Sequence, residues 1–217
     1  MKKFLLPALA ATLLLAATAV AAPLDAFKGM KGTLDIAGGT AHIPVMKEAA
    51  KRIMTANPDI RITVAGGGSG VGVQQVGEGL VQIGNTGRPL KDKEIEKFGL
   101  KTFPFAIDGV ALVVNPANNV SDITAQQAAD IYNGKITNWK EVGGEDLKIQ
   151  VINRDEASGT REAFRTIVMD GTPFDRRSAV LSGTGQVRDV VSRSRGAIGY
   201  ISLGFVDSLN AKTSVKA

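Results

Sequence analysis

The sequence contains no cysteine, which excludes disulfide bonds and thiolate chemistry. Its single histidine, His42, is expected to be a packing or surface residue, and no cluster of metal-ligating residues occurs, so no metal and no cofactor is expected. Aromatic residues make up only 5% of the chain and the lysines are scattered, which excludes the usual footprint of nucleic-acid binding. What remains is ordinary globular material: 217 residues, 44% of them hydrophobic.

Only the N-terminus has a long apolar run, and residues 4–17 are too short to cross a bilayer comfortably. Lys2 and Lys3 precede this run, and Ala19-Val20-Ala21 fits the small-x-small cleavage rule. We therefore predict that residues 1–21 are a cleaved signal peptide; the alternative is an uncleaved anchor. An exported chain without disulfides fits a periplasmic location. Loss of the two lysines would lower the formal net charge from +5 to +3.

The sequence also lacks the common phosphate-loop signatures, although residues 66–72 are rich in glycine. No Gly-Lys-Ser/Thr occurs there, which excludes a Walker A loop, and Gln75 replaces the last glycine that a dinucleotide fingerprint requires. Val71 breaks the Gly-x-Ser-x-Gly nucleophile elbow. The remaining possibilities are that Ser69 lies in a nest of backbone N–H groups at a helix start, or that the segment is a flexible surface turn.

The most informative motif is Arg154-x-x-x-Ser158-Gly159-Thr160, between an apolar strand at 147–152 and a segment with helical spacing. The first N–H groups of a helix have no intrahelical partner, and the helix dipole makes that end partly positive. Two hydroxyls and a glycine would let an anion approach these groups, and an arginine adds a planar fork of donors. The alternative interpretation is a serine N-cap beside a surface arginine.

Predicted strands and helices alternate along the chain, which indicates an α/β fold with mostly parallel sheets. Ligands bind such folds beyond the carboxyl ends of the strands, where the glycine- and hydroxyl-rich turns gather. Two groups of these turns favour two lobes. The expected strands lie around residues 34–37, 60–64, 80–84, 101–107, 110–114, 147–152 and 196–204. The expected helices lie around residues 45–54, 73–76, 92–98, 124–134, 163–168 and 186–194.

With these segments in order, residues 33–205 resemble the periplasmic phosphate-binding proteins of ABC transporters. The segments that carry the resemblance are Gly39-Thr40-Ala41, Gly-Gly-Gly-Ser-Gly at 66–70, Ile83-Gly84-Asn85-Thr86, Gly134-Lys135-Ile136-Thr137-Asn138-Trp139, the Arg154 motif, and Gly196-Ala197-Ile198-Gly199-Tyr200. The resemblance implies a two-lobed type II periplasmic binding protein with mixed, mostly parallel sheets and a ligand cleft between the lobes. It places lobe I at 33–112 and 196–217 and lobe II at 113–195, with hinges near 109–115 and 195–199.

By the same resemblance, the protein would be a monomeric receptor, not an enzyme, that captures inorganic phosphate and delivers it to a membrane permease. The phosphate-binding residues would be Thr40, Ala41, Ser69, Thr86, Arg88, Arg154, Ser158, Gly159 and Thr160. The alternatives are a receptor for another oxyanion, such as sulfate or molybdate, and a secreted phosphatase.

Two departures from the family pattern affect these expectations. Well-known members have an aspartate, which accepts the proton of hydrogen phosphate, where this chain has Gly87 followed by Arg88. Either Arg88 belongs to a variant site that tolerates sulfate, or it points to solvent and Glu156 or Asp108 accepts the proton; Glu156 is also the expected partner of Arg154. Relatives usually continue well past the Gly-Tyr strand, so part of lobe I is expected to be missing, through natural truncation or an incomplete sequence.

Overall fold

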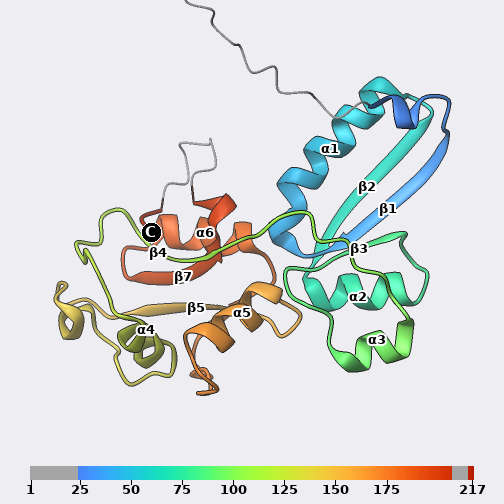
Figure 1. The fold of residues 1–217 in the computed structure, drawn as a ribbon. Helices are drawn as coiled ribbons and strands as arrows, with labels where there is room; N and C mark the ends of the chain where they lie inside the picture. The colour runs from blue at the N-terminus through green and yellow to red at the C-terminus, as the bar shows by residue number, and fades with distance from the viewer. Residues whose placement is uncertain (1–23, 207–214) are drawn as a thin grey trace, which may run out of the picture.

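The computed structural model describes residues 24–206 and 215–217, and the predicted signal peptide at 1–21 lies outside them (Figure 1). No helix within the described part is long and apolar enough to cross a membrane. The strands are β1 (Gly32–Gly38), β2 (Ile60–Gly67), β3 (Ile83–Asn85), β4 (Val110–Val114), β5 (Gln150–Arg154), β6 (Ala179–Leu181) and β7 (Ala197–Ser202). The α-helices are α1 (Ile43–Ala56), α2 (Ser69–Gly77), α3 (Asp92–Phe98), α4 (Ala125–Tyr132), α5 (Gly159–Ile167) and α6 (Thr184–Arg193). Short 3-10 turns are η1 (Leu24–Phe27), η2 (Thr40–His42), η3 (Trp139–Val142) and η4 (Leu203–Phe205).

The strands form two sheets, and this confirms the predicted α/β fold with mixed, mostly parallel sheets. The first sheet has the order β2-β1-β3, and all its strands are parallel. The second has the order β4-β7-β5-β6; β5 runs parallel to both neighbours, whereas β4 is antiparallel to β7. We call the first sheet with α1–α3 the first lobe and the second sheet with α4–α6 the second lobe (Figure 1).

Several helix boundaries follow directly from local sequence signals. Helix α1 ends at Ala56, just before Asn57-Pro58, because the residue before a proline disfavours helical backbone. Thr124 caps α4 in a reciprocal capping box with Gln127, because its hydroxyl accepts the Gln127 N–H while the glutamine side chain returns to the Thr124 N–H. These caps fix where each helix starts and stops before any tertiary packing is considered.

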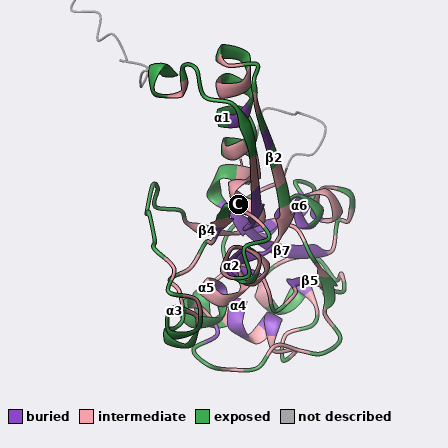
Figure 2. Ribbon diagram, turned by 90° about the vertical axis from the view of Figure 1, so that its right-hand side faces the viewer, coloured by how far each residue is buried: buried purple, intermediate pink, exposed green. Residues whose placement is uncertain are grey.

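The second lobe holds most of the buried core (Figure 2). Its largest cluster packs α4, α5, β5 and β7 around Tyr132, Phe164 and Tyr200. The rings of Phe164 and Tyr200 are stacked, and the ring of Tyr132 is tilted against both. In the first lobe, only Ile36, Ala50 and Ile62 form a fully buried cluster between β1, β2 and α1. The second lobe is therefore the firmer platform for side chains at the ends of β5 and α5.

The strand pairing differs from the predicted division of the chain. Residues 196–217 were assigned with 33–112, but β7 pairs with β4 and β5 in the second sheet. The predicted boundary between residues 112 and 113 falls inside β4. A local pattern shows that a segment is a strand but not which sheet it joins, because that choice depends on distant partners.

The connection between the lobes also differs from the prediction. Residues 101–107 were expected to form a strand, but they are exposed and irregular, with Phe103 81% and Ile107 103% exposed. No described strand pairs with them, so their alternating pattern has no ladder to join. The expected hinge at 195–199 lies partly within β7, and the expected hinge at 109–115 covers β4. These two strands pair with each other in one continuous ladder, so neither range is a separate flexible link. Within the described residues, segment 86–109 joins the two sheets.

Candidate functional site

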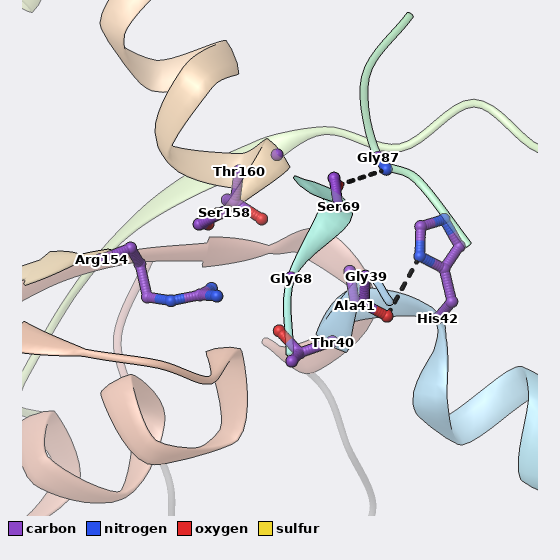
Figure 3. Close-up of a pocket in the computed structure, with 11 residues that line it drawn as sticks. Gly39, Thr40, Ala41, His42, Gly68, Ser69, Gly87, Arg154, Ser158 and Thr160 are labelled. Carbon is purple, nitrogen blue, oxygen red and sulfur yellow. Dashed lines mark hydrogen bonds between the residues drawn. The ribbon is translucent and has the colours of Figure 1, made fainter. Parts of the chain in front are cut away.

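A small pocket, with a cavity of only about 10 Å³, lies where turns of the first lobe meet the end of β5 and the start of α5 (Figure 3). Both lobes contribute to its wall. The residues that line it are Gly39, Thr40, Ala41, His42, Gly68, Ser69, Gly87, Arg154, Ser158, Gly159 and Thr160. No carboxylate is among them. The predicted residues Thr40, Ala41, Ser69, Arg154, Ser158, Gly159 and Thr160 are thus brought together.

Arg154, the last residue of β5, provides the positive charge of the pocket. It is 2% exposed, and its burial lowers the pKa of its guanidinium. Its Nε donates to the Leu181 carbonyl at 3.0 Å, its Nη2 to the Ser182 carbonyl at 3.0 Å, and its Nη1 to Thr184 Oγ1 at 3.1 Å. A guanidinium has five N–H donors, so two remain, one on each Nη. Within the described part, no carboxylate forms an ion pair with Arg154.

The start of α5 supplies neutral donors opposite this arginine. Ser158 is the N-cap, and its Oγ accepts the Arg161 N–H at 3.1 Å. Since a hydroxyl that accepts can still donate, the serine proton stays available to a ligand. Among the described residues, the backbone N–H groups of Gly159 and Thr160 have no protein acceptor. The alternative interpretation from the sequence, a serine N-cap beside a surface arginine, is thus half correct. Ser158 is the N-cap, but Arg154 is buried.

Helix α2 brings a second helix start to the pocket from the first lobe. Ser69 is 1% exposed, and its Oγ accepts the Gly87 N–H at 2.9 Å, which again leaves the hydroxyl proton free to donate. Gly68 precedes it with φ of 94°, and a Cβ there would lie 2.7 Å from the Ala157 carbonyl oxygen. A Cβ on Gly159 would lie only 2.3 Å from Ser69 Oγ. Glycine at 68 and 159 thus permits the two helix starts to approach.

The turn after β1 forms the remaining wall. Thr40 and Ala41 lie in η2, and the Ala41 N–H has no protein acceptor among the described residues. His42 follows, with its Nδ1 3.3 Å from the Gly39 carbonyl oxygen and its ring 5.7 Å from that of Phe105. Because a carbonyl oxygen only accepts, this contact requires a proton on Nδ1. Figure 3 shows the imidazole beside Gly87, on the opposite side of Ser69 from Arg154.

Two predicted site residues, Thr86 and Arg88, do not line the pocket. The Arg88 guanidinium bonds Glu94 through both Nη atoms, at 2.6 and 2.8 Å, and also donates to the Pro89 carbonyl. Thr86 Oγ1 donates to the Arg88 carbonyl at 2.8 Å, so it closes the local turn. The ion pair with Glu94 accounts for the position of Arg88, which is held away from the pocket.

The carboxylates considered as proton acceptors are not in the pocket either. Glu156 is exposed and makes no ion pair with Arg154, and Asp108 is exposed on segment 86–109. His42, expected to be a packing or surface residue, lines the pocket instead. The sequence interpretation also missed Gly39, Gly68, Gly87 and Thr184. The adjacency of His42 to Thr40 and Ala41 was a usable signal, whereas no local pattern marks Thr184.

The arrangement is chemically suited to a small anion. It combines a buried cation without a carboxylate partner, unpaired N–H groups at Ala41, Gly159 and Thr160, and two hydroxyls whose protons remain free. Removing a charged ligand from water is costly unless fixed donors replace its hydration, and hydrogen bonds within the protein hold Arg154, Ser69 and Ser158 in position. Among the described residues, no cluster of three or more histidine and acidic side chains could hold a metal ion.

Comparison with known proteins places this chain in a family. The model of the PBP superfamily domain matches residues 26–217. The chain is 40% identical over 187 residues to the phosphate-binding protein PstS of Bacillus subtilis, and 32% identical over 190 residues to that of Borreliella burgdorferi. Each match covers 84% of this chain and 62% or 66%, respectively, of the relative. The chain thus spans less than two thirds of the length of these curated relatives.

Two solved structures extend the similarity. A phosphate ABC transporter substrate-binding protein from Clostridium perfringens, with bound phosphate, matches with a TM-score of 0.78 and 40% identity over 86% of this chain and 74% of its own. An ABC-type phosphate transport receptor from Vibrio cholerae matches with a TM-score of 0.61 and 36% identity over 86% of this chain and 75% of its own. This chain therefore belongs to the PBP superfamily and, within it, to the phosphate ABC transporter substrate-binding proteins.

Proposed function

We propose that this protein captures inorganic phosphate in the pocket around Arg154 and delivers it to the membrane permease of an ABC importer. The observation that carries the proposal is the buried Arg154, which, among the residues that the structure describes, has two unused donors and no carboxylate partner. A tetrahedral oxyanion would supply the missing negative charge and accept from Arg154, Ser69, Ser158 and the free N–H groups. Similarity to phosphate-binding relatives supports phosphate over other oxyanions.

The family consists of substrate-binding proteins, so the secreted phosphatase considered from the sequence is not retained. We propose further that the protein acts as a monomer in the periplasm and that the two lobes enclose the ligand. The pocket wall supports this last point, because Thr40 and Ser69 come from the first lobe and Arg154 and Ser158 from the second. Residues 99–109, which follow α3, would then be the described part of the hinge.

Isothermal titration calorimetry in phosphate-free buffer tests the proposal directly. Phosphate should bind with a dissociation constant of about 1 μM or below, which corresponds to roughly −8 kcal/mol. Sulfate titrated first, and then phosphate, compares the two anions on the same sample. If neither anion gives a binding heat, in protein that unfolds cooperatively, the proposal of an oxyanion receptor is refuted. If sulfate binds more tightly than phosphate, sulfate takes the place of phosphate as the proposed ligand.

A further inference from the structure

Thr184, the first residue of α6, contacts site residues of both lobes although it does not line the pocket. It is fully buried. Its Oγ1 lies 3.0 Å from Thr40 Oγ1, and its backbone N–H donates to Thr40 Oγ1 at 3.2 Å. The same Oγ1 accepts from Arg154 Nη1 at 3.1 Å. One side chain of the second lobe therefore meets the arginine of its own lobe and the threonine of the other.

The hydrogen bonds link Arg154, Thr184 and Thr40 in one chain. Arg154 can only donate, so its N–H points at Thr184 Oγ1. The Thr184 N–H points at Thr40 Oγ1, and either hydroxyl can be the donor between the two oxygens. Where Thr184 is that donor, the Thr40 hydroxyl keeps its own proton for a ligand. Hydrogen bonds in such a chain polarise one another.

The position of Thr184 is not explained by a helix-capping role. Helix α6 begins after Gly183, which has no side chain to cap it, and Thr184 is the first residue of the helix, not its N-cap. Among the described residues, the hydrogen-bond partners of its hydroxyl are Thr40 and Arg154, which both line the pocket. A second contact between the lobes, from Gly70 N–H to the Ala157 carbonyl at 2.9 Å, lies at the start of α2. Both contacts join protein groups directly.

We propose that Thr184 is a positioning residue that latches the lobes together and orients Arg154 and Thr40 toward the bound anion. It would act through these two residues without touching the ligand. The part of this inference that concerns phosphate affinity rests on the proposed function. The part that concerns lobe closure does not, because the latch forms between protein groups.

Thr184→Val tests the latch, since valine keeps the shape of threonine and removes the hydroxyl. Thr184→Ser keeps the hydroxyl and should restore the phosphate affinity that Thr184→Val loses. Thr166→Val serves as the matched control, because the Thr166 hydroxyl bonds only the Glu162 carbonyl of its own helix. Calorimetry with inorganic phosphate should show affinity at least about tenfold weaker for Thr184→Val. Thr184→Ser and the control should stay within about threefold of wild type.

Distance measurement tests closure separately. The chain has no cysteine, so the paired substitutions Lys51→Cys on α1 and Arg165→Cys on α5 allow two spin labels to be attached specifically. In phosphate-free buffer, Thr184→Val should shift the distance distribution toward a longer, more open separation, whereas Thr184→Ser should resemble wild type. Thr40→Val removes the other half of the contact and should open the lobes similarly.

The outcomes are distinguishable. Wild-type affinity and unchanged distances in Thr184→Val would overturn the latch. An equal loss of affinity in Thr184→Ser would assign the effect to packing and also overturn it. If wild type itself does not bind phosphate, the proposed function fails, and the distance distributions alone decide on the latch. If Thr184→Val does not fold, unchanged distances in Thr40→Val contradict the proposal.

Discussion

Replacing Arg154 with methionine should separate ligand binding from stability. Methionine fills the buried volume but supplies neither charge nor donors. We expect phosphate affinity to fall by roughly 2–5 kcal/mol, about 30- to 4,000-fold, because the charged donors of a desolvated site are lost. The free energy of unfolding in phosphate-free buffer should change much less.

The small effect on stability follows from two opposing terms. Three hydrogen bonds, to the Leu181 and Ser182 carbonyls and to Thr184, would be lost, at about 1.5–3 kcal/mol each for a charged donor. Burying a cation without a carboxylate partner costs several kcal/mol, and the substitution removes that cost. We therefore expect a net change within about 2 kcal/mol, in either direction.

Calorimetry with phosphate and urea unfolding in phosphate-free buffer measure the two quantities on the same protein. Arg61→Met, which removes an exposed arginine from β2, is the control and should alter neither. The reasoning would be refuted by the opposite pattern: unchanged phosphate affinity together with a loss of unfolding free energy well above 2 kcal/mol. That result would make Arg154 a structural residue.

Two further substitutions test other parts of the site and its surroundings. Gly159→Ala should weaken phosphate binding at least about tenfold, because the new Cβ would lie 2.3 Å from Ser69 Oγ and push the two helix starts apart. Its melting temperature should change little, because alanine favours the helix more than glycine does. Full phosphate affinity would show that the helix starts can separate without loss of binding. The Arg88 hydrogen bonds hold the pKa of Glu94 below its ordinary value of 4.5, so this pair stabilises the fold above about pH 4.5, and the contribution is lost as pH falls through the folded-state pKa. Glu94→Gln should thus cost about 1 kcal/mol at pH 7, and less in acid, by urea unfolding; a cost that grows in acid would reverse the sign of the linkage.

The sequence predicted best what short-range chemistry determines. The expected helices around residues 45–54 and 124–134 are both present, and each has a boundary signal that acts within a few residues: Asn57-Pro58 after the first and the Thr124 capping box before the second. The Arg154 motif was also local: a strand end, a serine N-cap and a glycine that begins α5. Such patterns leave the backbone few alternatives, so the start of α5 and the residues grouped around it could be predicted.

Long-range partners determined what could not be predicted. The sheet of β7 depends on β4 and β5, which are distant in sequence. Arg88 was predicted to be a ligand donor, but its guanidinium binds Glu94 on α3 instead. Thr184 had no recognisable pattern, since its role comes only from proximity to Arg154 and Thr40. Propensity and periodicity do not report which distant side chain is nearest.

The placement of β7 between β4 and β5 has a consequence for the order in which the chain can fold. Val110 of β4 pairs with Ser202 of β7. The first strand of the second sheet in chain order therefore pairs with one of the last described segments. Until β7 is synthesised, β4 and the β5-β6 pair have no strand to connect them, and their edges stay open. Such non-local pairing folds slowly, and an unfinished sheet of this kind is prone to aggregate. The second lobe of the nascent chain therefore cannot complete its sheet until the last described strand is available.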